Sequence, residues 1–221
     1  MLPGLRLLHP RRFPVTVLAL TLYLVGLVAV FGLRTWVQIR RTGSSGFHGI
    51  SGRPGSLRWW AGALFVLALV LGAVSLVLAA TGVTPPPDGA VASVLAVAGL
   101  VLTLLGFAGV VGAQTGMGTS WRIGVDESER TDLVTDGPFA WVRNPIFTAM
   151  VAAQAGLTLM VPTGWSLTAL ACLVVAVELQ VRYIEEPYLS QVHGAAYRTY
   201  AAATGRFVPG IGRMPAAVAA R

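Results

Sequence analysis

Two polar clusters interrupt an otherwise apolar chain, and their side chains are of types that bind small charged molecules. The first cluster, residues 133–147, reads Leu-Val-Thr-Asp-Gly-Pro-Phe-Ala-Trp-Val-Arg-Asn-Pro-Ile-Phe. The second contains Arg182, Tyr183, Glu185 and Glu186. Carboxylates accept hydrogen bonds from hydroxyl or ammonium groups, arginine binds anions, and an aromatic face attracts a cation. If the two clusters meet in the fold, they form a binding site.

The first cluster is expected to contain a break in the backbone. The residue before a proline is disfavoured in helical geometry, so the chain should break at Asn144, just before Pro145. Residues 136–138, Asp-Gly-Pro, are a turn signal, and the proline suits the start of a short helix over residues 138–143. A broken backbone at a membrane interface is costly unless its amide groups find partners, which predicts a ligand at this point.

The composition places the chain in a membrane. Its 221 residues are 55% hydrophobic and 11% charged, less than half the charge of an ordinary soluble domain, and the mean hydropathy is +0.71. Five apolar stretches approach the roughly 20 residues that cross a bilayer as a helix. They are residues 14–33, 59–80, 90–113, 146–161 and 165–181. The sequence predicts an all-α integral membrane protein with about five transmembrane helices, the first too long for a removable signal peptide.

The arginines indicate the orientation. The chain has 16 arginines and no lysine, and all but three fall on the inner side if the N-terminus is outside and the C-terminus inside. Both polar clusters then face the cytoplasm. Arginine without lysine in an Ala-, Val- and Gly-rich chain is typical of a GC-rich genome. The expected location is a bacterial-type plasma membrane. The net charge of +7 is not a clustered soluble patch, so no nucleic-acid partner is expected. We expect no bound metal either.

The end of the fifth apolar stretch is expected to continue as a polar helix. Its charged residues have the spacing of one helical face. They are Glu178, Arg182, Glu185 and Glu186. Glu178 is expected to pair with Arg182 one turn on. Pro187 should then end this helix and begin an amphipathic one over about residues 188–203, in which Tyr197 and Tyr200 are more typical of packing than of chemistry.

Gln114 and two loop segments complete the sequence-based picture. Gln114 is the first strongly polar residue at the end of the third apolar stretch, and it is either a helix-cap residue or a ligand contact. Residues 38–58, rich in Gly, Ser and Arg, form either a flap over the site or a basic linker at lipid headgroups. Residues 121–125 alternate between apolar and polar side chains, which predicts a short extended piece against the membrane face.

The ordered motifs resemble those of a known enzyme family. Residues 133–147, then Glu185 and Glu186, then residues 206–209 are similar to the C-terminal half of the isoprenylcysteine carboxyl methyltransferase family, over about residues 131–210. Members of that family are integral membrane enzymes that use S-adenosylmethionine. The resemblance implies a cytoplasmic cofactor site made by the loop between the third and fourth spans, the hairpin of the fourth and fifth spans, and the C-terminal amphipathic helix.

The resemblance also implies how the chain is organised. Residues 1–118 would be a three-span membrane region, residues 119–212 a cofactor-binding catalytic region with two spans and the C-terminal helix, and residues 213–221 a tail. Where the family reads Arg-His-Pro-x-Tyr, this chain reads Arg-Asn-Pro-Ile-Phe. Asn144 cannot titrate and Phe147 has no hydroxyl, so binding by shape, backbone amides and aromatic packing is expected.

Applied to this sequence, the resemblance assigns cofactor binding to residues of both clusters. They are Gln114, Leu133, Val134, Gly137, Phe139, Arg143, Asn144, Pro145, Phe147, Tyr183, Glu185 and Glu186. The candidate catalytic residues are Arg182, Glu186 and Arg206, with Arg182 or Arg206 receiving an anionic substrate head. The implied substrate is a lipophilic small molecule that arrives from the bilayer. Its nucleophile, a carboxylate or thiolate, is already ionised, so the reaction needs no general base.

Two alternative functions are left open by the sequence. A NADPH-dependent membrane oxidoreductase similar to sterol reductases would need basic groups for the 2′-phosphate, which Arg130, Arg143 and Arg206 could supply. A non-enzymatic membrane protein would keep the charged residues near Glu178 and Glu186 as a stabilising face.

Overall fold

The computed structural model describes residues 12–43, 45, 50, 52–117 and 132–215, and these form helices and turns without any strand. The α-helices are α1 (Arg12–Leu27), α2 (Arg34–Thr42), α3 (Leu57–Ala80), α4 (Ala90–Met117), α5 (Pro145–Met160), α6 (Gly164–Gln180) and α7 (Glu186–Ala203). The shorter elements are two π-helical turns, η1 (Val28–Leu33) and η4 (Val181–Glu185), and the 3-10 helix η3 (Gly137–Ala140). The all-α prediction is confirmed for this part of the chain. The extended piece predicted at residues 121–125 lies outside it.

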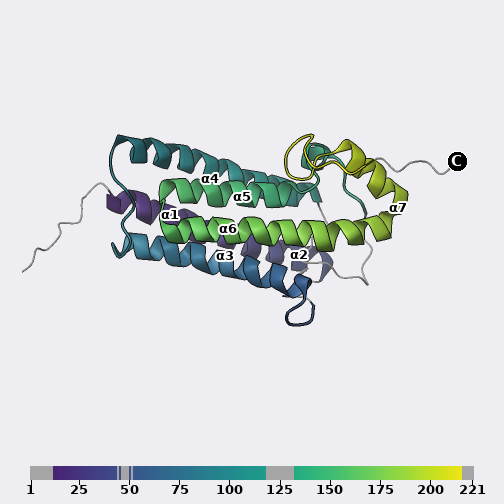
Figure 1. The fold of residues 1–221 in the computed structure, drawn as a ribbon, viewed down its shortest axis with the longest axis horizontal. Helices are drawn as coiled ribbons and strands as arrows, with labels where there is room; N and C mark the ends of the chain where they lie inside the picture. The colour runs from purple at the N-terminus through teal and green to yellow at the C-terminus, as the bar shows by residue number, and fades with distance from the viewer. Residues whose placement is uncertain (1–11, 44, 46–49, 51, 118–131, 216–221) are drawn as a thin grey trace, which may run out of the picture.

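Among the described residues, four helical stretches are long and apolar enough to cross a membrane. They are Pro14–Arg40, Leu57–Ala80, Ala90–Met117 and Gly164–Ala203. The fourth predicted span, residues 146–161, corresponds to α5, which has 16 residues and is therefore about 24 Å long. Figure 1 shows α1, α3, α4, α5 and α6 running alongside one another, with α7 turning away at one end of the bundle. The number of spans that cross a bilayer and the side that each end faces remain predictions.

Helices α4 and α5 pack in close contact because glycines face the partner backbone. A methyl group on Gly106 would lie 2.6 Å from the amide nitrogen of Ala153, and one on Gly156 would lie 2.4 Å from Oγ1 of Thr103. Residues without side chains let two helix backbones approach closely, which is a common way of joining helices in membranes. This seam fixes α5, and with it the polar segment that precedes α5.

The hairpin of α5 and α6 forms as predicted and is closed by a capping box. The Thr163 side chain accepts a hydrogen bond from the Ser166 amide, and the Ser166 hydroxyl accepts one from the Thr163 amide. Ser75 of α3 lies 2.9 Å from the Thr163 hydroxyl and joins the hairpin to its neighbour.

The predicted end of a helix at Pro187 is wrong, because helical structure runs without a gap from α6 through η4 into α7. Pro187 lacks an amide hydrogen, and its ring would collide with the preceding turn of a regular α-helix. The wider π-helical turn η4 directly precedes it and accommodates it. The amphipathic helix predicted near residues 188–203 is present as α7, but Gly194 interrupts it with φ 55° and ψ −122°.

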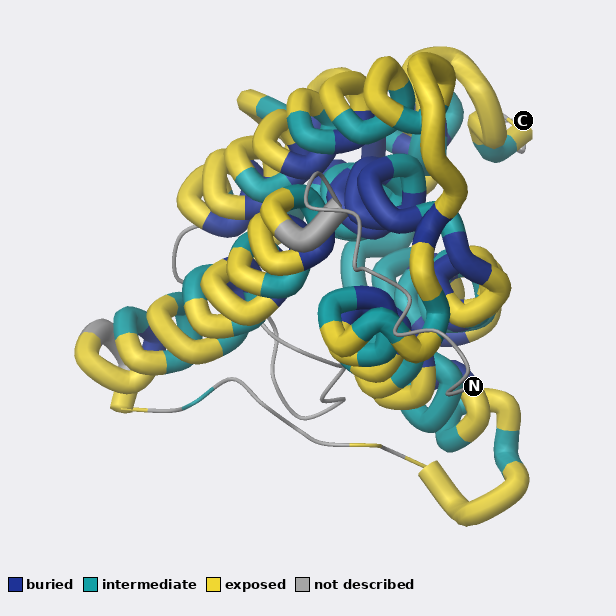
Figure 2. Tube along the Cα trace, turned by 90° about the vertical axis from the view of Figure 1, so that its left-hand side faces the viewer, coloured by how far each residue is buried: buried dark blue, intermediate teal, exposed yellow. Residues whose placement is uncertain are grey.

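Buried residues lie between the helices, while apolar side chains cover much of the outside. Figure 2 shows the buried positions on the inward sides of the helices and the exposed positions on their outer surfaces. Helix α4 alone exposes Val91, Val94, Val97, Val101 and Leu105, each more than half exposed. An apolar outer surface of this kind fits a lipid environment, in which apolar side chains need not be hidden from water.

Candidate active site

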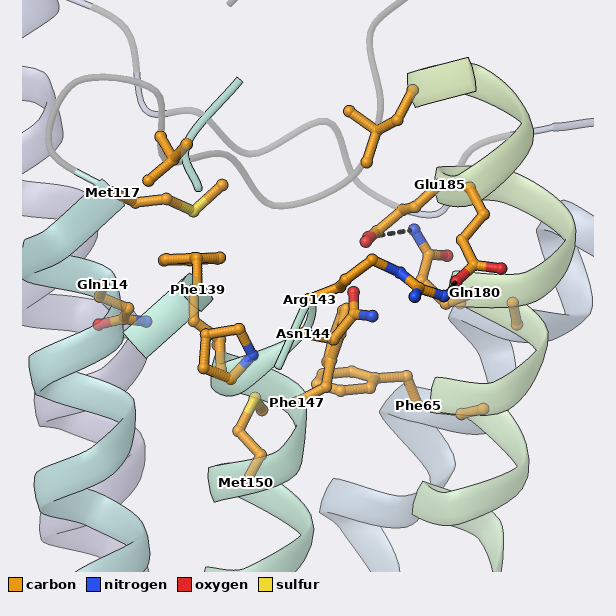
Figure 3. Close-up of a pocket in the computed structure, with 18 of the residues that line it drawn as sticks. Phe65, Gln114, Met117, Phe139, Arg143, Asn144, Phe147, Met150, Gln180 and Glu185 are labelled. Carbon is orange, nitrogen blue, oxygen red and sulfur yellow. Dashed lines mark hydrogen bonds and ion pairs between the residues drawn. The ribbon is translucent and has the colours of Figure 1, made fainter. Parts of the chain in front are cut away.

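A cavity of about 460 Å³ opens at the end of the bundle where the two polar clusters lie. Its wall combines η1, α3, the end of α4, residues 132–134, η3, the start of α5 and the α6–α7 junction. Both its volume and its mainly apolar wall with a few polar groups are typical of small-molecule sites. Figure 3 shows Arg143, Gln180 and Glu185 near one another, with Phe65, Phe147 and Met150 further along the bundle.

The predicted backbone break is present, but its amide groups bind the protein itself. Asn144 has φ −127° and ψ 58°, outside helical geometry. The amide of Arg143 donates to the Gly205 carbonyl at 2.8 Å, and the amide of Asn144 donates to the Arg206 carbonyl at 3.1 Å. The Asn144 side chain donates to the same carbonyl at 3.2 Å. The ligand expected at these amides is therefore replaced by a returning C-terminal segment, which the sequence did not predict. The helix expected over residues 138–143 is reduced to η3.

Three charged side chains hold that returning segment in place. The Glu186 carboxylate, which is 3% exposed, lies 2.5 Å from Nη2 of Arg143. It also accepts hydrogen bonds from Nε and Nη2 of Arg206 at 2.8 and 2.9 Å. The bond to Glu186 raises the pKa of Arg206 above its usual value, although burial opposes the rise. Arg143, Glu186 and Arg206 form what we call the buried cluster, which carries one net positive charge.

In the guanidinium of Arg143, the two Nη atoms have hydrogen-bond acceptors and Nε has none among the described residues. Its Nη1 donates to the Ala201 carbonyl at 3.0 Å and also to the Thr204 carbonyl, and its Nη2 donates to the Gly212 carbonyl at 3.1 Å. Its Nε is buried and has no acceptor among the described residues. Arg143 lines the cavity, so an unpaired buried donor lies in one of the residues of its wall.

Glu185 adds a carboxylate, a hydrogen-bond acceptor, to the same cavity. Its carboxylate accepts one hydrogen bond, from the Gln180 amide at 3.1 Å, and no arginine of the described residues pairs with it. Figure 3 shows this bond at the edge of the pocket. A partly buried carboxylate without a counter-ion favours a ligand that brings a positive charge or hydroxyl donors.

Gln114 connects two walls of the cavity. It is 4% exposed, and its Nε2 donates to the Val30 carbonyl of η1 at 3.1 Å. Arg34 donates to the Gln114 backbone carbonyl at 3.4 Å. A π-helical turn leaves a carbonyl without its usual partner, and such turns often occur at functional sites. Gln114 is therefore a cavity-lining residue that ties α4 to η1, not a helix cap.

One comparison with known proteins finds a family. Residues 94–196 match the family model of the phospholipid methyltransferases. That family includes the membrane methyltransferases that are similar to isoprenylcysteine carboxyl methyltransferase, so the predicted resemblance is confirmed. No curated protein matches the chain as a significant relative. The family match and the apolar helices together indicate a methyltransferase embedded in a membrane.

The matched region supplies one part of the cavity wall, and segments outside it supply the rest. The match begins within α4 and ends within α7, so it includes both polar clusters. The lining residues of η1 and α3 lie before it, and Tyr197 and Tyr200 lie after it. Among the described residues, no group of three His, Cys, Asp or Glu side chains is placed to hold a metal ion.

Most of the residues predicted to bind the cofactor line the cavity. They are Gln114, Leu133, Val134, Phe139, Arg143, Asn144, Pro145, Phe147, Glu185 and Glu186. Four other predicted site residues do not line it. Gly137 begins η3, and Arg206 belongs to the buried cluster. Arg182 is exposed and paired with Glu178, and Tyr183 is 60% exposed.

The prediction that four charged residues share one helical face is wrong. Glu178 and Arg182 point outwards, with side chains 37% and 50% exposed, whereas Glu186 is 3% exposed. The π-helical turn η4 contains one extra residue per turn, which rotates the next residues of the helix by about 100° relative to a regular helix. The acids at positions 185 and 186 are thereby turned towards the cavity.

Sequence reasoning missed several residues that line the cavity. Tyr197 is 2% exposed, and the Tyr200 hydroxyl donates to the Phe139 carbonyl at 2.6 Å. Gln180 positions Glu185 through its amide. The spacing of the two tyrosines, three apart in an amphipathic helix, showed that they share a face but not what that face meets. Gln180, a polar residue at the end of an apolar span, was an available signal.

Proposed function

We propose that the protein is an S-adenosylmethionine-dependent methyltransferase that acts on a lipophilic, anionic small molecule at the membrane interface. The family match supports a membrane methyltransferase, and a methyl donor of this kind is the one that the family suggests. The observation that carries the proposal is the pair of opposite charges in one apolar cavity. Glu185 has no counter-ion among the described residues, and Arg143 has a buried donor without an acceptor there.

The residues of the cavity fit the groups of the proposed cofactor. Its amino-acid part carries an ammonium and a carboxylate, which match Glu185 and Nε of Arg143. Its adenosine part is flat and largely apolar, which suits the wall of Leu133, Val134 and Phe139. The cofactor would supply a methyl group on a positively charged sulfonium. The aromatic ring of Tyr200 or Phe147 would favour that charge by about 0.5–2 kcal/mol.

The chain's own contribution to catalysis is positioning and exclusion of water. Holding a nucleophile in line with the methyl group replaces an unlikely encounter by a fixed geometry. The buried cluster holds the C-terminal segment against the start of α5, which fixes the position of Arg143 and Asn144 in the cavity wall. Because a carboxylate or thiolate acceptor is already ionised, no side chain has to remove a proton.

The acceptor is proposed to lie along α3. Arg58 and Phe65 both line the cavity and are seven residues apart on this helix, which is about 10 Å along its axis. Arg58 is at the first turn of α3, where it can attract an anionic head, and Phe65 is nearer the middle of the membrane. This arrangement assigns to Arg58, which lines the cavity, the role predicted for Arg182 or Arg206, neither of which lines it.

The oxidoreductase alternative is less well supported by these contacts. Two of the arginines that would bind the 2′-phosphate, Arg143 and Arg206, share the carboxylate of Glu186. The third, Arg130, lies outside the described residues.

The test is binding of S-adenosylhomocysteine to purified protein in lipid nanodiscs. A ligand that binds only the folded state raises the melting temperature, so S-adenosylhomocysteine should stabilise the protein and NADPH should not. By calorimetry, Glu185→Gln should weaken the affinity about tenfold, which corresponds to about 1.4 kcal/mol. The matched control is Glu178→Gln on the same helical run, which should bind like the wild type. Stabilisation by NADPH alone, or unchanged affinity in Glu185→Gln, would contradict the proposal.

A further inference from the structure

A second, smaller cavity lies next to the first and deeper in the bundle. It measures about 50 Å³ and its wall is almost wholly apolar. Four residues line both cavities: Val30, Phe31, Leu69 and Met150. We call it the deep pocket. Leu69 lies twelve residues after the start of α3, which is about 18 Å along the helix, so the deep pocket is near the middle of a bilayer about 30 Å thick.

The far wall of the deep pocket is closed by a large aromatic side chain. Phe107 of α4 lines the pocket together with Leu157 and Leu173. Its ring packs directly over Gly26 of α1, where an added methyl group would lie 2.2 Å from Cζ. The pocket therefore ends at the contact between α1 and α4.

Met150 stands between the two cavities, and its chemistry suits a movable partition. Methionine is unbranched and flexible, and it adapts its shape to neighbouring groups. Protein interiors are packed closely enough that voids larger than a water molecule are few, and an apolar void does not hold ordered water. An apolar void beside a flexible side chain that also faces a ligand cavity gives that side chain room to move.

We propose that Met150 divides the acceptor site from the deep pocket and sets how long an apolar tail the acceptor can carry. A short tail ends in the main cavity beside Phe65 and Phe147. A longer tail displaces the Met150 side chain and extends towards Phe107. This inference rests on the proposed function for the identity of the acceptor, but it concerns the depth of the site, which can be measured without any methyl transfer.

The experiment maps where apolar tails of different length end. The probes are n-alkylthioacetic acids that differ only in tail length and carry a photoreactive diazirine at the tail end. They are bound to the full-length protein in nanodiscs with S-adenosylhomocysteine present, irradiated, and located by mass spectrometry. The short probe should label the surroundings of Phe65 and Phe147. The long probe should label the surroundings of Gly26 and Phe107.

Two variants narrow the passage from different helices. Met150→Trp on α5 and Leu69→Phe on α3 should each lower labelling near Phe107 by the long probe about tenfold, while labelling by the short probe persists. The control Leu105→Trp adds the same bulk to the outer surface of α4, where Leu105 is 65% exposed, and should change neither pattern. Because the second variant makes a smaller change, it tests the inference even if Met150→Trp does not fold.

The outcomes distinguish this inference from the proposed function. If labelling near Phe107 is unchanged in both narrowing variants, Met150 does not divide the acceptor site from the deep pocket. A long probe that labels only outer positions such as Leu105 contradicts the inference as well. If S-adenosylhomocysteine fails to stabilise the protein but the labelled positions still follow tail length, the proposed function is contradicted. The inference that long tails reach the deep pocket is then still supported.

Discussion

Two Glu–Arg pairings lie eight residues apart on the same helical run, and they occupy different environments. Glu178 and Arg182 pair across one turn on the outer surface, with side chains 37% and 50% exposed. Glu186 instead pairs with Arg143 and Arg206, and its side chain is 3% exposed. The first pairing joins neighbours in the sequence. The second joins the start of α5, the start of α7 and the C-terminal segment, so it determines tertiary structure.

The difference shows that burial and connectivity, not residue type, decide what a charge pair contributes. An exposed pair gains little, because water solvates the separated charges almost as well. A buried pair is costly to assemble, but removing one partner leaves an uncompensated charge out of water. In the buried cluster, loss of the single carboxylate would leave two guanidinium groups without their shared partner.

The largest expected effect comes from removing that carboxylate. Glu186→Gln should destabilise the protein by about 3 kcal/mol, because Arg143 is left buried without a counter-ion. The melting temperature in nanodiscs, read by size-exclusion fluorescence of heated samples, measures the change. Glu178→Gln is the matched control, and its free energy of unfolding should lie within about 0.5 kcal/mol of the wild-type value. Equal losses in the two variants would remove the distinction between the pairings.

The next effect tests the C-terminal segment that the buried cluster holds. A methyl group on Gly205 would lie 2.1 Å from the Val208 carbonyl oxygen, so Gly205→Ala must shift the loop. We expect a loss of about 2 kcal/mol and faster cleavage after residue 205 in limited proteolysis. Gly164→Ala, which meets nothing within 4 Å, should have no such effect. Wild-type protease resistance in Gly205→Ala would show that the segment is not held as described.

A smaller effect is expected from loss of the hydrogen bond between uncharged groups of α7 and η3. Tyr200→Phe removes the hydroxyl that donates to the Phe139 carbonyl at 2.6 Å, which should cost about 1 kcal/mol. Differential scanning fluorimetry is sufficient to detect it. Tyr183→Phe is the control, since Tyr183 is 60% exposed and lies outside the cavity. If Tyr200→Phe lost as much stability as Glu186→Gln, the buried charges would not be the main interactions that hold this region.

The smallest effect concerns salt. Added salt screens exposed charges but hardly reaches buried ones, so the small difference between Glu178→Gln and the wild type should vanish in about 1 M NaCl. The deficit of Glu186→Gln should persist under the same conditions, because water and ions have little access to it. Melting curves of the three proteins at low and high salt provide the measurement. A deficit of Glu186→Gln that disappears with salt would place its charges in solvent.

Several features of this protein could be predicted from sequence because they depend on local physics. Hydropathy predicted the apolar helices, since a helix that meets lipid must be apolar along its length. The break at Asn144 followed from the steric effect of Pro145 on the residue before it. Most of the residues to which the resemblance assigned cofactor binding line the cavity, although their role stays a prediction.

Other features depended on contacts between distant segments. The amides at Asn144 bind Arg206, which is 62 residues away, and no local pattern in the sequence specifies that contact. Arg182 was predicted from its spacing to share a helical face with Glu185, yet its side chain lies on the outside. The cause is the π-helical turn η4, a change of one residue in helical phase that the regular 3.6-residue period could not reveal.

The sequence by itself therefore determined which segments are apolar helices, where the backbone breaks and which family model the central region matches. Tertiary structure decided which charges face inwards, and it completed the cavity wall with η1, α3 and α7. The reason is physical. Helix formation and lipid exposure are set by a residue and its near neighbours, whereas the partner of a buried charge is set by the packing of every segment around it.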